Sequence, residues 1–180
     1  METMECIKTR RSCRAFTEER VSHEVLEEIV GAAAYAPSWK NTQITRYVVV
    51  EDKEKMKEIA DDCILGFTFN ANTINQAAAL VVVSMVTGRS GYERDGSFTT
   101  SKEDRWQNFD AGIATQTFCL AAHEKGLGTV IMGIFDDAKV AKVVELPDNQ
   151  QVAALIAIGY PKATPDTPPR KAVEELLSYC

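Results

Sequence analysis

One long helical segment, residues 104–125, constrains the fold more than any other feature of the chain. Its apolar side chains surround most of the helix axis, and Gly126 follows as a helix-ending residue. These apolar positions are Ala111, Ile113, Ala114, Phe118, Cys119, Leu120, Ala121 and Ala122. The pattern predicts a helix buried on nearly all sides. We expect a second copy of the chain to help cover it, which predicts a homodimer.

Helical and strand patterns alternate along the rest of the chain. Helices are predicted over residues 22–36, with Ser22 as N-cap, over 53–64, and after Asp136 or Asp137. Strands are predicted over 47–51, 79–86, 129–134 and 152–159. The alternation favours an α+β or α/β fold of about four strands, and no linker divides residues 1–180 into two domains. A Pro-rich extension, about residues 160–180, ends in a short helix.

Charge and composition exclude several function classes. The 180 residues carry a net charge of −6, whereas a general nucleic-acid binder is normally basic. The most apolar run, residues 77–86, is too short to cross a bilayer, and residues 1–11 lack the apolar core of a secretory signal. The five cysteines contain no C-x-x-C pair and the two histidines have no metal-ligand spacing. We therefore expect a cytoplasmic protein without a metal site or membrane partner.

The segment Ile7–Thr17 is the first of four that could carry chemistry. It holds Lys8, Arg10, Arg11 and Arg14 and no acidic residue. Guanidinium groups give planar, multi-donor contacts to phosphate, and the Ser12 hydroxyl could add one more donor. A solvated basic face would have the same composition, so the segment alone leaves both interpretations open.

The other three segments are equally ambiguous in isolation. Residues 36–43 form a polar loop stiffened by Pro37, which could read the edge of a planar ring or simply end a helix. The glycines of residues 126–133 precede a strand and Ile131 stands where a third glycine would be needed, so they do not form a dinucleotide-binding fingerprint. Arg170 and Lys171 follow two prolines and could clamp an anion or could serve only as charges that favour solubility.

Taken together and in order, these segments resemble the flavin-dependent nitroreductase family, and the resemblance covers essentially the whole chain. The motifs that carry it are Arg10-Arg11-Ser12-Cys13-Arg14-Ala15-Phe16, Ala36-Pro37-Ser38-x-x-Asn41-x-Gln43, Asp110-x-Gly112, Gly126-Leu127-Gly128-Thr129 with Met132-Gly133, Leu146-Pro147 before Val152–Pro161, and Arg170. The resemblance implies an α+β fold with a central, mostly antiparallel or mixed sheet flanked by helices. It also implies an intertwined homodimer that binds FMN at the subunit interface, with the 160–180 extension packed on the partner subunit.

By analogy with the family, each motif has a place around FMN. Arg10, Ser12 and Arg14 would hold the phosphate, the ribityl chain and the flavin N1/O2 region, with Arg170 clamping the phosphate and Arg11 close by. The 36–43 loop would reach the partner's cofactor through Pro37, Ser38, Trp39, Asn41 and Gln43. The backbone of Met132 and Gly133 would lie near flavin N5. No catalytic side chain is implied, because the flavin itself carries the hydride chemistry. Some family members have Glu where Met132 stands, a difference that bears on substrate range.

The resemblance implies an FMN-dependent oxidoreductase that takes hydride from NAD(P)H and passes it, in a ping-pong cycle, to a flat acceptor such as a nitroaromatic or a quinone. The substrate lid is expected in residues 66–72 and 87–103. Two alternatives stay open: a flavin-binding module for storage or sensing without turnover, and another flavin reaction on the same fold, such as reductive dehalogenation.

Overall fold

The computed structural model describes all residues from 1 to 180, and a four-stranded antiparallel sheet forms its centre. The strands are β1 (Thr45–Val50), β2 (Ala79–Val86), β3 (Gly128–Met132) and β4 (Gln150–Gly159), in the order β1-β2-β4-β3. All three pairings are antiparallel, with one register shift between Val83 and Ser84. The prediction of four strands is confirmed, and β2 has the predicted bounds.

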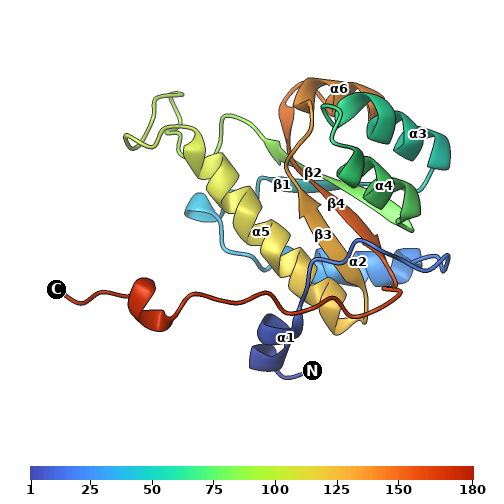
Figure 1. Ribbon diagram of the computed structural model, residues 1–180. Coiled ribbons are helices and arrows are strands. Elements are labelled where there is room, and N and C mark those ends of the chain that lie inside the picture. Colours follow the sequence, from blue (N-terminus) through green and yellow to red (C-terminus); the bar gives the residue numbers. More distant parts are fainter.

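Helices cover both faces of the sheet. They are α1 (Thr3–Thr9), α2 (His23–Ala33), α3 (Lys53–Glu58), α4 (Thr68–Gln76), α5 (Arg105–Glu124) and α6 (Asp137–Val143), with short helical turns at Trp39–Asn41, Ile59–Cys63 and Val173–Glu175. Residues alternate along each strand, so Leu80 and Val82 pack toward α3, α4 and α6. Val81 and Val83 pack toward α2 and α5 on the other face. Figure 1 shows these two helical layers on either side of the sheet.

Local signals fixed several helix ends. The Ser22 hydroxyl accepts the Val25 N–H at the start of α2, and the Asp136 carboxylate accepts the Lys139 N–H at the start of α6. Gly126 follows α5 with φ +78°, and the N–H of Leu127 donates to Ala122 O, as a helix-ending glycine requires. These predicted caps are confirmed.

Other predicted bounds were wrong. The helix predicted over 22–36 ends at Ala33, four residues before Pro37, because residues 34–36 already turn toward the loop. By contrast, the helix predicted over 53–64 is confirmed over residues 53–63, with an α-helical first half and a π-helical turn from Ile59. Two helices that periodicity did not indicate, α1 and α4, are also present.

The long helix α5 is not buried all round within one chain. Ala111, Ala114 and Phe118 face the sheet and α2, whereas Phe109 is 56% exposed on the other side. The expectation of burial on nearly all sides is therefore wrong for the single chain. The C-terminal extension leaves the body of the domain (Figure 1), and every residue from 166 to 180 is exposed. No helix is both long enough and apolar enough to span a membrane.

Candidate functional site

A strongly polar cavity of about 360 Å³ brings the N-terminal and C-terminal arginines together. None of its lining residues is hydrophobic, and they are Arg10, Arg11, Ser12, Arg14, Pro165, Asp166, Thr167, Pro168 and Arg170. We call this cavity the arginine site. Residues more than 150 positions apart in the sequence thus meet in space, as the resemblance implied. Asp166 is the single carboxylate among four guanidinium groups.

The strand-like run Ser12–Cys13 sets the position of these arginines. Ser12 forms a parallel bridge with Thr129 at the start of β3, and the Cys13 N–H donates to Thr129 O at 2.9 Å. Gly128 makes this approach possible, since a Cβ there would lie 2.6 Å from the Cys13 Cβ. Cys13 is 3% exposed, and burial raises the pKa of its thiol. The interpretation of Cys13 as a packed residue is confirmed.

Helix α1 directly precedes the arginine run and is tied to the C-terminal end of α5. The Cys6 thiol donates to Leu120 O, and Met1 pairs with Glu124. The Thr9 hydroxyl donates to Glu5 O and accepts from His123 Nε2 at 2.8 Å. Burial and the neighbouring Arg10 both lower the pKa of His123.

The guanidinium groups of the arginine site have no carboxylate partner. None of the ion pairs in the structure includes Arg10, Arg11, Arg14 or Arg170. Arg11 donates to Lys8 O and to the Thr167 hydroxyl, and Arg170 donates to Pro168 O. The Arg14 guanidinium lies 5.5 Å from the centre of the Phe69 ring. The four guanidinium groups therefore carry more positive charge than the single Asp166 carboxylate balances, and a phosphate would supply further negative charge.

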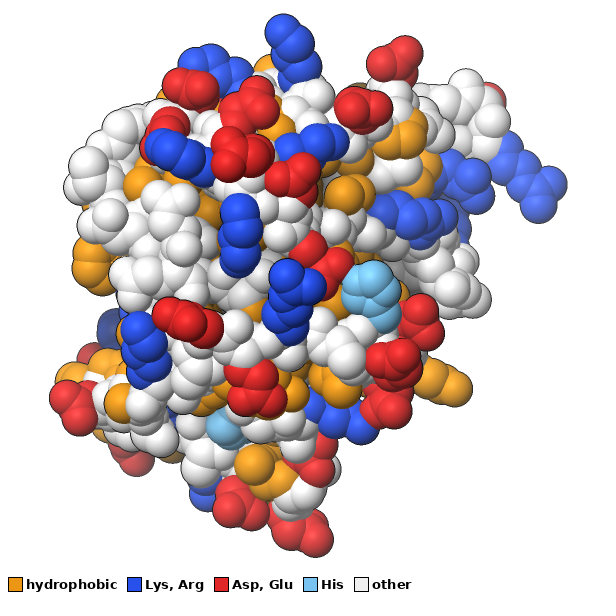
Figure 2. Space-filling view, turned by 90° about the vertical axis from the view of Figure 1, so that its right-hand side faces the viewer, with side chains coloured by type: hydrophobic (Ala, Val, Ile, Leu, Met, Phe, Trp, Pro, Cys, Tyr) orange, Lys and Arg blue, Asp and Glu red, His pale blue; other side chains and the backbone are white.

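Elsewhere on the surface, charges of both signs mix. On the face drawn in Figure 2, acidic and basic side chains are interspersed. That face has no continuous basic area of the kind that tracks a nucleic-acid backbone. No group of three or more His, Cys, Asp and Glu side chains is arranged to hold a metal ion.

The 37–43 loop lies elsewhere in the chain, against the N-terminal half of α5. The backbone N–H of Trp39 donates to the Asp110 carboxylate at 2.9 Å, and the Gln43 N–H donates to the Ser38 hydroxyl at 2.9 Å. Lys40, Asn41 and Gln43 all have positive φ, at 45°, 56° and 47°. Pro37, Asn41 and Gln43 are exposed.

This loop lines a second cavity, of about 340 Å³, which shares no residue with the arginine site. Its lining is Val30, Ala33, Ala34, Ala36, Pro37, Ser38, Gln43, Thr45, Arg46, Tyr47, Val49, Asp110 and Ala114. The Tyr47 hydroxyl and the Trp39 indole N–H are buried without a hydrogen-bond partner. Burial raises the pKa of Tyr47 to about 12, so its hydroxyl stays protonated. The structure thus places the five predicted loop residues together and apart from the arginines of the same chain.

Met132 is the last residue of β3, and Gly133 follows it. The Met132 side chain is buried in the core, whereas Gly133 is exposed and a Cβ there would meet nothing within 4 Å. The backbone at Gly133 is consequently open to approach by a ligand.

Two residues near these sites, Thr167 and Ser90, were not predicted, and a third, Phe69, was expected only as part of the substrate lid. Thr167, in the Pro-rich extension, accepts a hydrogen bond from Arg11. In that extension only the prolines indicated a restricted backbone. Phe69 lies beside Arg14 and falls within the 66–72 segment expected to form part of the lid. Ser90, from the polar 87–103 loop, is fully buried and bonds Asp110, and no local pattern indicated this.

The comparisons with known proteins agree on one family. Residues 7–160 match the model of the Nitroreductase family. A relative from Archaeoglobus fulgidus, provisionally named as an NADH dehydrogenase/NAD(P)H nitroreductase, is 31% identical over 169 residues, which are 92% of this chain and 88% of the relative. The oxygen-insensitive NADPH nitroreductase of Helicobacter pylori is 28% identical over 96% of this chain and 94% of its own. The structure of the NADPH:FMN oxidoreductase of Vibrio harveyi with NAD+ superposes with a TM-score of 0.81 at 26% identity, covering 98% of this chain and 76% of that one.

Proposed function

This chain belongs to the nitroreductase family and is an NAD(P)H-dependent flavin oxidoreductase, and we propose that it uses FMN to pass hydride to a flat acceptor such as a nitroaromatic or a quinone. The proposed cycle is ping-pong: NAD(P)H binds, is oxidised and leaves before the acceptor binds. When bound, the flavin accepts the hydride and later delivers it, so no side chain of the chain needs to act as a general acid.

The observation that carries the choice of FMN is the arginine site. Four guanidinium groups repel one another there and have no carboxylate in an ion pair, so an anionic phosphate ester would relieve the repulsion. We assign the phosphate to Arg10 and Arg170, with Arg11 close by, and the ribityl chain to Ser12. Arg14 is assigned to the N1/O2 side of the ring, where a fixed cation favours reduction.

The second half of the proposed site comes from a partner subunit. Because the 37–43 loop and the arginine site do not share a cavity within one chain, we propose that the loop serves the partner's flavin in a homodimer. Phe109, Ile131 and Ile134 are exposed and would be covered by a second copy. The extension, with Leu176 70% exposed, would pack on that copy. Sedimentation at a mass near 40 kDa is expected from the 19.9 kDa chain, and a 20 kDa species contradicts the dimer.

One reconstitution experiment tests the whole proposal. The purified protein is saturated with FMN, freed of excess cofactor, and mixed anaerobically with NADH and, separately, NADPH. Bound yellow absorbance that bleaches with either donor and returns on adding a nitroaromatic or a quinone is the expected result. A protein that neither retains FMN nor gains thermal stability from it contradicts the proposal.

The same experiment separates the alternatives. Retention of FMN without bleaching by either donor indicates a flavin-binding module without turnover. Bleaching that is reversed by a halogenated aromatic with release of halide, but by no nitroaromatic or quinone, indicates reductive dehalogenation.

A further inference from the structure

We propose that Asp110 is a positioning residue that locks the 37–43 loop and the 87–103 loop into a single unit. The inference rests on the proposed function in one respect, which is that the 37–43 loop is the part of the chain assigned to the flavin ring. The coupling itself is a property of the chain and can be measured without flavin.

One carboxylate oxygen makes both connections. Asp110 Oδ2 accepts the Trp39 backbone N–H at 2.9 Å and the Ser90 hydroxyl at 2.5 Å. Because Ser90 donates to Asp110, its oxygen accepts from the Thr42 hydroxyl, 2.7 Å away. Asp110 thus holds Trp39 directly and Thr42 through Ser90, at both ends of the turn. We call these four residues the Asp110 junction.

The centre of the Asp110 junction is buried, whereas Trp39 and Thr42 are half-buried, and the junction lies at the base of both loops. Asp110 is 3% exposed and Ser90 is 0% exposed, and Asp110 belongs to no ion pair. Removing either hydrogen-bonding partner would leave a buried polar group unsatisfied, which is much more costly than losing a surface hydrogen bond. Gln107, one turn earlier on the same face of α5, accepts the Gly88 N–H at 2.7 Å and fixes the base of the 87–103 loop independently.

The 37–43 loop needs such an anchor because its backbone is strained. Lys40, Asn41 and Gln43 occupy the left-handed region, which non-glycine residues avoid and keep only where surrounding contacts enforce it. The strained turn presents the Ser38, Asn41 and Gln43 side chains. Releasing its anchor is therefore expected to change which atoms the loop offers to a ligand.

The 87–103 loop is held together by hydrogen bonds and ring packing of its own. Its Glu93 N–H donates to Ser97 O and its Thr99 N–H donates to Gly91 O, while the Tyr92 and Phe98 rings pack at 4.8 Å. Gly91 has φ +87°, and a Cβ there would lie 2.2 Å from Glu103 O. The segment expected to form part of the substrate lid is thus an internally bonded loop.

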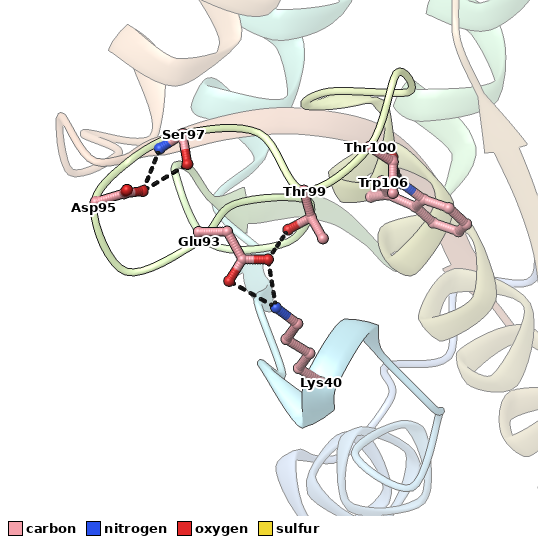
Figure 3. A network of polar contacts seen from close by, with 7 residues as sticks. All are labelled: Lys40, Glu93, Asp95, Ser97, Thr99, Thr100 and Trp106. Atoms are coloured by element: carbon pink, nitrogen blue, oxygen red, sulfur yellow. Dashed lines mark hydrogen bonds and ion pairs between the residues drawn. The ribbon is translucent and has the colours of Figure 1, made fainter.

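Two outer contacts complete the unit. Figure 3 shows the Glu93 carboxylate between the Thr99 hydroxyl and the Lys40 ammonium, which it contacts at 2.6 and 3.0 Å. The Trp39 and Trp106 rings lie 4.9 Å apart, and the Trp106 indole N–H donates to the Thr100 hydroxyl. The buried junction and these surface contacts connect the same two loops, so a displacement of one loop displaces the other.

The experiment compares two nearly isosteric replacements in the flavin-free, full-length protein. Asp110→Leu removes the acceptor, whereas Asp110→Asn keeps an amide oxygen that can accept both donors. Asp104→Leu and Asp104→Asn are the matched controls, because Asp104 is exposed at the start of α5 and caps nothing with its side chain. Hydrogen–deuterium exchange is followed over residues 36–46 and 87–103. Near-UV circular dichroism reports on Trp39 and Trp106, the only tryptophans.

Asp110→Leu is expected to speed exchange in both segments by about tenfold or more and to weaken the tryptophan signal. Asp110→Asn is expected to recover most of the protection, and both Asp104 variants to match wild type. A folded Asp110→Leu protein with wild-type exchange in either segment overturns the proposal. If that variant does not fold, Ser90→Ala decides: faster exchange over 36–46 supports the coupling, and wild-type exchange there overturns it.

FMN titration then tests the consequence for binding. Asp110→Leu is expected to weaken FMN and riboflavin affinity by a similar factor, about tenfold, because the loop is assigned to the ring rather than to the phosphate. Asp110→Asn is expected to restore both affinities. If wild-type protein does not bind FMN, the proposed function fails, whereas the exchange result still decides whether Asp110 couples the loops.

Discussion

The arginine site and the Asp110 junction are built on opposite principles. The residues of the arginine site are half-buried or exposed, none of them is hydrophobic, and its four cations form no ion pair. The centre of the Asp110 junction is buried, and its carboxylate is satisfied by donors from two loops. The arginine site has an excess of positive charge until an anion binds. The Asp110 junction has its hydrogen bonds satisfied, but it holds a turn with a strained backbone. Ionic strength should therefore act on the first region, and changes of packing on the second.

The largest effect on stability is expected at Gly128. This residue supports the arginine site through tight packing, which is otherwise the property of the Asp110 junction. Gly128→Ala would place a Cβ 2.6 Å from the Cys13 Cβ and push the arginine run away from β3. We expect the free energy of unfolding to fall by about 1–3 kcal/mol, measured by urea denaturation. FMN affinity should fall with it.

Gly133→Ala is the matched control, since its Cβ would meet nothing within 4 Å. Its stability should stay within about 0.5 kcal/mol of wild type. An equal loss of stability in Gly128→Ala and Gly133→Ala would show that the close approach at Gly128 is not what positions the arginines.

The next effect sharpens the electrostatic side of the comparison. Arg170→Ala should weaken FMN binding by about tenfold or more, because a charge-assisted contact to phosphate is lost, while riboflavin, which lacks the phosphate, should bind as before. Titrations at low and high salt should show the FMN difference shrinking as salt rises. Arg20→Ala, which removes an exposed cation that lines neither cavity, serves as the control. If Arg170→Ala weakened riboflavin binding as much as FMN binding, Arg170 would not be the residue that contacts the phosphate.

The same contrast explains how much the sequence could predict. Strand β2 was predicted to the residue, because a run of β-branched residues buried on both faces leaves little alternative. Helix α4, TFNANTINQ, was missed because Asn and Thr are weak helix formers and only the buried Asn70, Thr73 and Ile74 hold it in place. The burial of α5 was overestimated, because periodicity reports which positions are apolar and not which chain covers them.

The candidate site divides in the same way. The arginines were recognisable as a group through the family resemblance, but their meeting depends on the pairing of Cys13 with Thr129, which no local pattern encodes. The Asp110 junction was harder still to predict: Asp110 was noted only as part of a motif, and Ser90 lay in a loop expected to form part of the substrate lid. Contacts between loops depend on backbone paths that tertiary packing sets.

A smaller effect is expected from the exposed Lys40–Glu93 ion pair, which connects the 37–43 loop to the 87–103 loop at the surface. Lys40→Met removes one of the contacts that lower the pKa of the Glu93 carboxyl, whereas the Thr99 hydroxyl, the first cause of that lowering, remains. Exchange over residues 36–46 should rise far less than in Asp110→Leu, since exposed ion pairs contribute little. A Lys40→Met effect as large as the Asp110→Leu effect would place the anchor at the surface instead.

The smallest expected effect is a pH dependence of the free energy of unfolding, which arises because His123 lies near Arg10. Burial, then the nearby Arg10, lowers the His123 pKa below its ordinary value of 6.5, so the unfolded chain binds the proton more tightly. His123 should therefore make stability rise with pH up to about 6.5, whereas His23, whose pKa is raised by Glu51, contributes stability that is lost as pH rises through its folded pKa. Urea denaturation of His123→Gln and His23→Gln between pH 5 and 8 should show changes of opposite sign.

The histidine also gives a direct test of whether an anion occupies the arginine site. Phosphate beside Arg10 and Arg11 would offset part of their repulsion of a protonated imidazole, so the His123 pKa should rise when inorganic phosphate or FMN is added. The His23 pKa should not move, because its ring pairs with Glu51 and not with the arginine run. NMR titration of the two imidazole signals measures both in one sample. A His123 pKa that ignores both anions would mean that the uncompensated charge of the arginine site is not what binds phosphate.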